Sequence, residues 1–191
     1  MSQSTAPQST TPQSTTPQLR YLEAGLQILA RDGYPALKLA AVCAETSTTT
    51  GSFYYAFPNW ASYCQHLIEY WRHNKSEVLI DTVKSVEDPR ERIDALLEVA
   101  LNLPYASEAA IRIWSASDSD VAAVVAEADA ARVAVIADSY TALIGDAERG
   151  EHLARLAMML LVGHELGTTS TFEELSWSFH SLLDWALTPI R

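Results

Sequence analysis

Histidine side chains are the first candidates for chemistry, because their spacing could hold a metal ion. His66 and His73 lie seven residues apart, and His180 and Asp184 lie four residues apart. On a helix, either spacing places both side chains on one face. A structural zinc site needs four protein ligands and a catalytic site three, and neither pair has a convergent third ligand. We therefore predict no metal site and interpret these histidines as solvated or packed side chains.

Motifs of enzymes are missing from the sequence, which contains no phosphate loop, dinucleotide fingerprint, nucleophile elbow or pair of catalytic carboxylates. The segment 163–166, GHEL, lacks the second histidine of the HExxH zinc motif. Cys43 and Cys64 form neither a CxxC nor a Cys/His spacing, and Cys43 lies in an apolar segment, as is typical of a small buried hydrophobe. We predict that the protein is not an enzyme and holds no cofactor.

A run of hydroxyl-bearing side chains offers a different chemistry. Residues 46–55 are TSTTTGSFYY, and such side chains suit hydrogen bonds to phosphate oxygens and base edges. The run follows a short apolar helix predicted over 37–45, and it predicts a tight turn and a second short helix. This is the helix-turn-helix arrangement, in which the second short helix enters the major groove of DNA. Val42, Phe53 and Phe57 are expected to hold the helices together.

The charge distribution permits this contact, although the net charge of −11 would repel phosphate. Five of the 13 basic residues but only four of the 24 acidic residues lie within residues 1–75. Nearly all of the excess negative charge therefore belongs to the C-terminal part. We expect the N-terminal part to face the polyanion.

The elements that must position these residues are all predicted to be helical. Residues 1–18 repeat PQSTT and predict a disordered, low-complexity tail. A helix over 19–31 follows, and Asp32–Gly33 ends it. Six longer helices are predicted over 59–85, 88–102, 105–116, 119–144, 147–168 and 172–187. With apolar residues at helical spacing and no segment of alternating pattern, the fold class is predicted to be all-α, with about nine helices.

Localisation is predicted from what the sequence lacks. No apolar run approaches the roughly 18 residues of a membrane span. The polar N-terminus predicts neither a secretory signal nor a transit peptide. We expect a cytoplasmic protein with no membrane partner.

The helix-turn-helix segment goes further than spacing alone. Residues 21–71, YLEAGLQILARDGYPALKLAAVCAETSTTTGSFYYAFPNWASYCQHLIEYW, resemble the N-terminal domain of the tetracycline-repressor (TetR) family of transcriptional regulators. Residues 24–33 match the family's first helix and turn, and residues 42–43 match its usual Ile-Ala pair. Residues 51–54 stand where the family usually has Gly-Thr-Leu-Tyr, and Phe57 stands at the end of its recognition helix. The resemblance is specific over residues 19–72. Beyond it, the helical pattern and residues 111–132, IRIWSASDSDVAAVVAEADAAR, are similar to the family's effector half.

The resemblance implies a ligand-responsive regulator, usually a repressor, that binds palindromic double-stranded operator DNA as a homodimer and is released by a small effector. It implies an N-terminal three-helix DNA-binding domain over 19–58 and a helical ligand-binding and dimerisation domain over 59–191. The DNA contacts of the family fall on six residues of this chain, Lys38, Thr49, Thr50, Ser52, Tyr54 and Tyr55.

Three departures from the family pattern affect these contacts. Lys38 replaces the usual Thr, which removes a helix cap and adds a charge that seeks phosphate. Ser47 replaces Gly in the turn, where a left-handed conformation costs more for a residue with a Cβ. Trp60 replaces a Lys that commonly contacts phosphate, so one source of phosphate affinity is missing.

A pocket for a hydrophobic or aromatic effector is predicted among the helices of 59–144. These helices supply aromatic side chains for which the sequence shows no obvious further layer of packing residues. Such side chains are typical of the mostly apolar walls of small-molecule sites. The wall candidates, with Arg112 as polar anchor, are Trp71, Tyr105, Arg112, Trp114 and Tyr140. The alternative interpretation is that these residues simply complete the core.

A two-fold dimer contact is predicted from the last two helices. The helix over 147–168 is apolar on more sides than one neighbour needs, and its small residues permit close approach. The predicted interface residues are Leu153, Leu156, Ala157, Leu160, Leu175, Phe179, Leu182 and Leu183.

A helical adaptor that binds protein without specific DNA binding stays open as the alternative function. An acidic C-terminal half and the Trp60 replacement are both compatible with it, and Tyr54 and Tyr55 would then be amphipathic packing residues. An electrophoretic mobility shift with specific and random DNA distinguishes the two functions.

Overall fold

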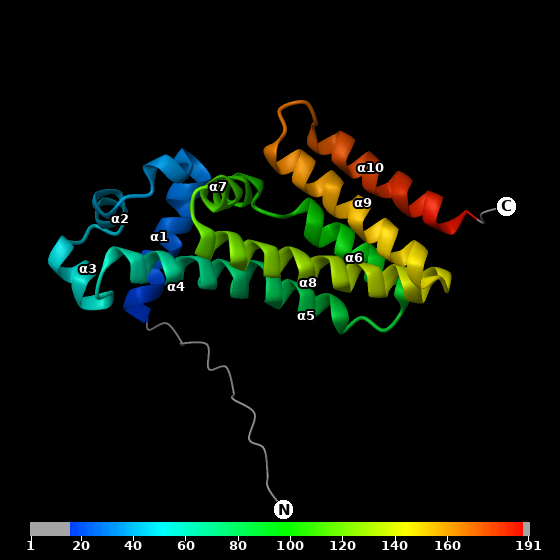
Figure 1. The fold of residues 1–191 in the computed structure, drawn as a ribbon, viewed down its shortest axis with the longest axis horizontal. Coiled ribbons are helices and arrows are strands. Elements are labelled where there is room, and N and C mark those ends of the chain that lie inside the picture. The colour runs from blue at the N-terminus through cyan, green and yellow to red at the C-terminus, as the bar shows by residue number, and fades with distance from the viewer. Residues whose placement is uncertain (1–15, 189–191) are drawn as a thin grey trace, which may run out of the picture.

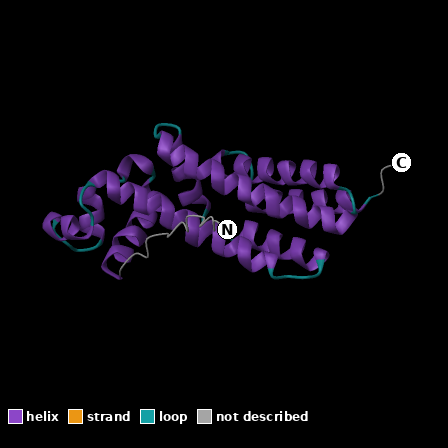
Figure 2. Ribbon diagram, turned by 60° about the horizontal axis from the view of Figure 1, so that its bottom comes forward, coloured by secondary structure: helices purple, strands orange, loops and turns teal. Residues whose placement is uncertain are grey.

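The computed structural model describes residues 16–188, except for the side chains at 16, 75, 76, 78, 79 and 82. Within that range the secondary structure consists of helices and contains no strand (Figure 2), which confirms the all-α class. Helix α1 (Thr16–Asp32) begins three residues before the predicted start, so residues 16–18 are helical and do not belong to the tail. The rest of the predicted disordered tail, 1–15, lies outside the described residues.

The helix-turn-helix follows α1 after a 3-10 turn at Tyr34–Ala36. Helix α2 (Leu39–Glu45) and helix α3 (Thr50–Ala56) are both short, as predicted, and each contains seven residues. Helix α2 begins two residues after its predicted start at Leu37. Figure 1 shows α2 and α3 together at one end of the elongated molecule. Isolated helices this short are marginal in water, so tertiary packing must stabilise them.

The body contains the remaining helices. They are α4 (Trp60–Arg72), α5 (Val78–Lys84), α6 (Pro89–Leu101), α7 (Tyr105–Ser115), α8 (Ser119–Ile144), α9 (Ala147–Leu166) and α10 (Phe172–Leu187). The long helix predicted over 59–85 is α4 and α5, joined by a π-helical turn at His73–Glu77. Counted as one interrupted helix, it brings the described helices to the predicted nine. In Figure 1, α4 and α5 lie along α8, while α9 and α10 pack together on the other side.

Side-chain caps fix several helix starts, because the first N–H groups of a helix have no partner within it. Asn59 accepts from the backbone N–H of Ser62, and Asp88 accepts from Arg90 and Glu91. Thr171 and Glu174 form a capping box at the start of α10. Asp118 caps α8 by accepting from the backbone N–H groups of Asp120 and Val121.

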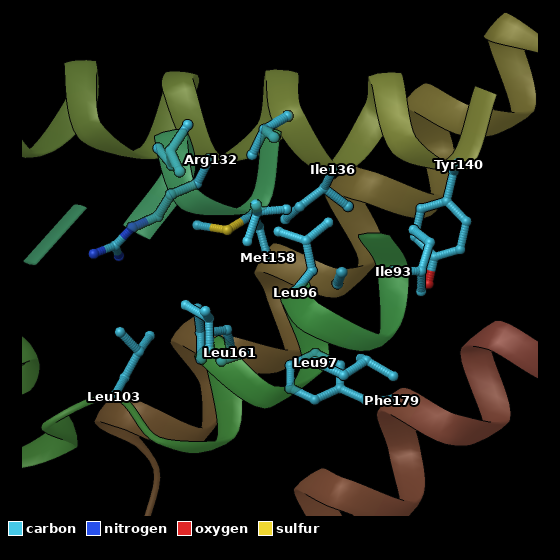
Figure 3. Close-up of a pocket in the computed structure, with 16 residues that line it drawn as sticks. Ile93, Leu96, Leu97, Leu103, Arg132, Ile136, Tyr140, Met158, Leu161 and Phe179 are labelled. Carbon is cyan, nitrogen blue, oxygen red and sulfur yellow. The ribbon is translucent and has the colours of Figure 1, made fainter. Parts of the chain in front are cut away.

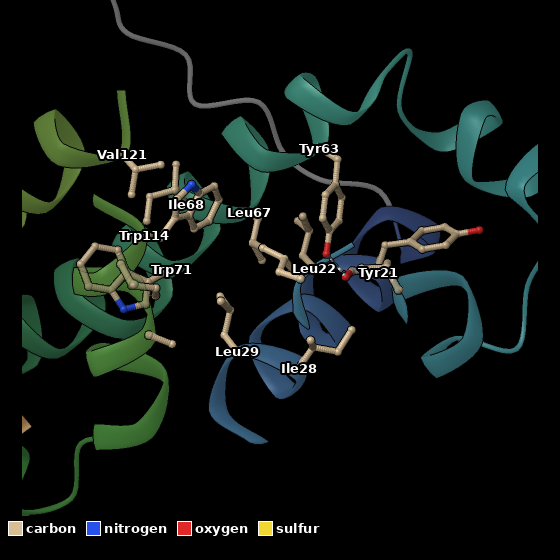
Figure 4. Packing of buried hydrophobic residues seen from close by; sticks show 14 of the residues in the cluster. Tyr21, Leu22, Ile28, Leu29, Tyr63, Leu67, Ile68, Trp71, Trp114 and Val121 are labelled. Carbon is tan, nitrogen blue, oxygen red and sulfur yellow. Dashed lines mark hydrogen bonds between the residues drawn. The ribbon is translucent and has the colours of Figure 1, made fainter. Parts of the chain in front are cut away.

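Two main hydrophobic cores hold the helices. The first joins the α1–α3 region to the body, because it unites residues of the three N-terminal helices with residues of α4, α7 and α8 (Figure 4). Trp114 of α7, for example, stacks on Tyr34 with ring centroids 5.3 Å apart. The second core fills the space between α6, α8, α9 and α10. The packing is therefore continuous across the boundary predicted at residues 58 and 59.

A glycine permits the close approach of α1 and α4. A Cβ at Gly25 would fall on the Tyr63 hydroxyl and on the methyl groups of Leu67. Only a residue without a side chain lets these helices meet at this point. As for membranes, none of the described helices is both long and apolar enough to span one.

Candidate nucleic-acid interface and effector cavity

Helix α3 buries one aromatic side chain, Phe53, and exposes two others, Tyr54 and Tyr55. Phe53 is fully buried and contacts the rings of Tyr21, Phe57 and Tyr63. Tyr54 is 50% exposed and packs edge-on against Phe53, whereas Tyr55 is 96% exposed. Since water covers almost all of Tyr55, packing within the chain does not explain its aromatic ring. Both tyrosines have the exposure that a base or phosphate contact requires.

Two of the predicted DNA contacts are engaged in capping α3. The Thr49 hydroxyl accepts a hydrogen bond from the backbone N–H of Ser52 at 3.2 Å, and the two hydroxyl oxygens lie 3.1 Å apart. A hydroxyl can still donate or accept one further bond. Thr49 and Ser52 can therefore each bond a phosphate and still keep the cap. Thr50, in the first turn of α3, is exposed.

The turn between α2 and α3 contains the strain predicted for Ser47. Its φ is +53°, the left-handed region, and among the described non-glycine residues Ser47 alone has a positive φ. Hydrogen bonds around it hold the turn: Thr46 Oγ1 donates to the Val42 carbonyl at 2.8 Å, and Thr48 N–H donates to the Cys43 carbonyl at 2.8 Å. Ser47 thus adopts the left-handed conformation at the higher cost that a Cβ brings.

Basic residues near α3 are few, and most are already engaged. Arg31 bonds Glu45 and Asp32, which raises the pKa of Arg31 and lowers that of Glu45. Arg20 donates to the Thr46 carbonyl at 3.0 Å. Lys38 is exposed at the start of α2 and, as predicted, provides no side-chain cap. It is the basic side chain of this region best placed to reach a phosphate.

Trp60, at the position where a Lys was expected, has a packing role. Its indole stacks on Phe53, with centroids 6.1 Å apart, and contacts Tyr63 at 4.9 Å. The first residue of α4 thus contacts the buried Phe53 of α3. A movement of α4 would act directly on α3 through this contact.

An apolar cavity of about 80 Å³ lies in the body and is lined largely by residues of the second core (Figure 3). Its walls come from α5, α6, α8, α9 and α10, and they include Ile80, Leu96, Ile136, Met158 and Phe179. Tyr140 and Arg132 are the lining residues that carry polar groups. Burial raises the pKa of Tyr140 to about 12, so its hydroxyl stays protonated at neutral pH.

The structure places only one of the five predicted pocket residues, Tyr140, on this cavity. Trp71 and Trp114 are buried in the first core instead. Tyr105 donates to the Ala100 carbonyl at 2.7 Å, and its ring meets His164 edge-on. Arg112 is held by Asp129 and Glu165. Aromatic content alone could not distinguish a cavity wall from a filled core.

A largely buried cluster of charges, for which the sequence alone predicted no partners, connects three helices, α7, α8 and α9. Arg112 forms a two-pronged contact with Asp129, at 2.7 and 3.0 Å, and also contacts Glu165 at 2.5 Å. Arg132 contacts Glu108 at 3.0 Å. Burial raises the pKa of Glu165, although Arg112 opposes that shift.

The sequence contained a signal for this cluster, because Arg132 interrupts the apolar stripe of α8 between Ala128 and Val135.

The residues predicted for the dimer contact mostly face the inside of the protomer. Leu156 and Leu160 are partly exposed, but the other six are buried in the second core: Leu153, Ala157, Leu175, Phe179, Leu182 and Leu183. Side chains buried inside the protomer offer little surface to a second subunit. The exposed apolar residues of α9 and α10 are others, namely Met159, Leu166, Phe172, Trp177, Trp185 and Leu187. Periodicity marked both helices as apolar on several sides without deciding which stripe turns inward.

Solved structures share this arrangement of helices. A TetR transcription regulator from Haloarcula marismortui superimposes with a TM-score of 0.72 at 17% identity, covering 89% of this chain and 96% of its own. NemR of E. coli, in its reduced form, gives 0.73 at 17% identity, with coverage of 91% and 100%. The chain has the TetR-regulator fold. A transcriptional regulator from Saccharomonospora viridis in complex with choline also matches, with a TM-score of 0.72, 15% identity and coverage of 87% and 95%.

The TetR-type likeness is one of structure. Neither a family sequence model nor a curated protein matches the chain. The superpositions nevertheless extend over about nine tenths of the chain, so they include both the helix-turn-helix and the body. The resemblance seen in residues 19–72 of the sequence therefore extends, as a fold, to the helices beyond it.

Proposed function

We propose that this protein is a ligand-responsive transcriptional repressor that binds palindromic operator DNA as a homodimer in the cytoplasm. The observation that carries the proposal is the outward projection of Tyr54 and Tyr55 from α3, which directly follows a helix-turn-helix turn. Residues 19–58 form the head that reads DNA, and residues 59–191 form the body that binds the effector and the second subunit. Lys38, Thr50 and the capping pair Thr49 and Ser52 provide the polar contacts.

The effector is a small, neutral, apolar molecule that occupies the cavity in the body. The walls are aliphatic and aromatic, and transfer of an unpaired charge into such surroundings is costly. Tyr140 offers a single hydroxyl for orientation. The Saccharomonospora viridis regulator, solved with choline, shows a protein of this fold with a bound small molecule, but the cavity of this chain favours an uncharged ligand.

The second subunit covers the outer faces of α9 and α10. Trp177 is 72% exposed and Met159 is 64% exposed. Gly163, on the same side of α9 as Met159, has no heavy atom within 4 Å of a Cβ position, so another helix can approach closely there. A two-fold dimer through these faces would present two heads to half-sites about 34 Å apart, one turn of DNA.

Selection of genomic fragments by the purified full-length protein tests the proposal. The selected fragments should share an inverted repeat. Fluorescence anisotropy should then show binding to the repeat at least about 10³-fold tighter than to a shuffled sequence. Equal affinity for both sequences would contradict the proposal.

A second candidate, the protein-binding adaptor, is favoured by one observation. Arg20, Arg31 and Lys38 are balanced by Glu23, Asp32 and Glu45 over residues 16–58, so the head lacks the positive surface that phosphate attracts. The same selection experiment decides between the candidates, because an adaptor enriches no sequence.

A further inference from the structure

A closed triad of buried side chains connects α4 to the body. The indole N–H of Trp71 on α4 donates to Oε1 of Glu108 on α7 at 2.6 Å. The other carboxylate oxygen, Oε2, accepts from Nη2 of Arg132 on α8 at 3.0 Å. The guanidinium carbon of Arg132 also lies 5.6 Å from the centroid of the Trp71 ring. Each of the three residues therefore contacts both others, and all three are buried.

Arg132 belongs to the triad and to the cavity wall at the same time. Figure 3 shows its stem beside Met158 and its guanidinium directed away from Tyr140. Its aliphatic part thus faces the cavity, whereas its charge is bound to Glu108. Asp129 of the same helix also lies 3.8 Å from Arg132, but Glu108 is the closer carboxylate, at 3.0 Å. Separating a buried arginine from such a carboxylate is strongly unfavourable. If the stem of Arg132 moves, Glu108 and Trp71 are expected to move with it.

The small volume of the cavity favours such a movement. It measures about 80 Å³, whereas small-molecule sites usually measure about 300 to 1,000 Å³. A protein interior is close-packed and transmits strain rather than absorbing it. Most effectors must therefore push the walls apart, and Arg132 is the wall residue whose far end is bound to another helix by charge.

We propose that the Arg132–Glu108–Trp71 triad transmits occupancy of the cavity to α4. Trp71 lies in the last turn of α4, and Trp60 in the first turn contacts Phe53 of α3. A displacement at Trp71 therefore changes the position of α4 against the recognition helix. The consequence for DNA rests on the proposed function, but the mechanical step does not. The competing route runs through α5, because Ile80 and Val83 also line the cavity and α5 follows α4 through the π-helical turn.

The test uses two matched variants. Trp71→Phe keeps an aromatic ring but removes the indole N–H that donates to Glu108. Trp114→Phe is the control, because Trp114 is also buried and its N–H donates to Asp118 at 3.2 Å, outside the triad and the cavity wall. The indole N–H signals of the parent are recorded by ¹⁵N NMR, and each is assigned by its disappearance in the matching variant.

Two occupants can fill the cavity in place of an effector that is not yet identified. Benzene is the diffusible probe, because an apolar cavity of about 150 Å³ accommodates it, and Ala157→Leu adds three carbon atoms permanently to a wall residue. Both should shift the Trp71 indole signal and leave that of Trp114 in place. Should Ala157→Leu lose its helical circular dichroism, Ala100→Leu provides the occupant from α6. An unmoved Trp71 signal in a folded, filled variant overturns the proposal.

The operator measurement distinguishes this proposal from the proposed function. Benzene should lower the operator affinity of the parent and of Trp114→Phe by about fivefold or more, and that of Trp71→Phe by less than twofold. An equal response of Trp71→Phe and the parent overturns the triad and favours the α5 route. If benzene shifts the Trp71 signal of the parent but its operator affinity stays constant, the triad is supported and effector release of DNA is contradicted.

Discussion

The hydroxyl of Tyr63 on α4 donates a hydrogen bond of 2.9 Å to the backbone carbonyl of Tyr21 on α1 (Figure 4). Both rings are buried in the first core and contact Phe53 of α3. One hydrogen bond and one aromatic cluster thus join α1, α3 and α4. The orientation of α3 depends on α4 through these contacts.

Removing this bond should lower stability without disturbing the fold. Tyr63→Phe deletes the hydroxyl and keeps the ring, and a single buried hydrogen bond contributes about 1 kcal/mol to the free energy of unfolding. Urea denaturation measures the decrease. The control, Tyr55→Phe, changes a hydroxyl on a side chain that is 96% exposed and should be neutral. Because the core is shared, unfolding should follow one transition, and separate transitions for head and body would contradict this interpretation.

Two glycines should respond to alanine with opposite signs. Gly25→Ala places a methyl group on the Tyr63 hydroxyl and Leu67, and such overpacking costs about 1 to 3 kcal/mol. A Cβ at Gly51 on α3 meets only Thr49 Oγ1 at 3.7 Å, so Gly51→Ala should raise stability by about 0.5 kcal/mol through helix propensity. Thermal unfolding of both variants checks the signs. A neutral Gly25→Ala would show that α1 and α4 separate easily.

The exposed tyrosine should be needed for DNA but not for folding. Tyr55→Ala should leave the melting temperature unchanged and weaken binding to the selected operator by about 1 to 3 kcal/mol. Anisotropy titrations with the operator and with random DNA measure the effect, and Tyr55→Phe shows whether the hydroxyl or the ring matters. Unchanged operator affinity in Tyr55→Ala would move the interface away from this face of α3.

Lys38 should contribute affinity without specificity. Lys38→Ala removes a charge that phosphate attracts, so it should weaken binding to operator and random DNA by the same factor. It should also reduce the slope of log K against log salt by about 0.9 for each phosphate that the lysine neutralises. Arg31→Ala is the control, because Glu45 and Asp32 already compensate that charge. If Arg31→Ala has the larger effect on the slope, the assignment of the phosphate contact is wrong.

Charges on the outer face of α9 and α10 should separate the subunits. Met159→Asp and Trp177→Asp replace exposed apolar side chains, so each protomer should keep its fold while a dimer would bury an unpaired charge. Leu182→Asp replaces a buried residue of the second core and should instead unfold the chain. Sedimentation at micromolar concentration reports the mass, and circular dichroism reports the fold. A parent protein that already sediments as a monomer would contradict the dimer.

The sequence determined the features that depend on near neighbours in the chain. The caps at Asn59, Asp88 and Thr171 satisfy backbone N–H groups within three residues, so their local pattern predicts where those helices start. The positive φ of Ser47 likewise follows from the tight turn around it. The helical periodicity predicted the all-α class for the same reason.

Tertiary structure decided which of several apolar stripes turns inward. Leu182 and Trp177 lie on the same helix and are both apolar, yet one is buried and the other is 72% exposed, because only the packing of α10 on α9 and α6 selects the inner face. It also decided that Trp71 fills a core while Ile136 lines a cavity. An arginine within an apolar stripe, Arg132, is tolerated there because carboxylates meet it, Glu108 of α7 at 3.0 Å and Asp129 of its own helix at 3.8 Å. Periodicity reports that a side chain is apolar, whereas its burial depends on partners that lie far away in the sequence.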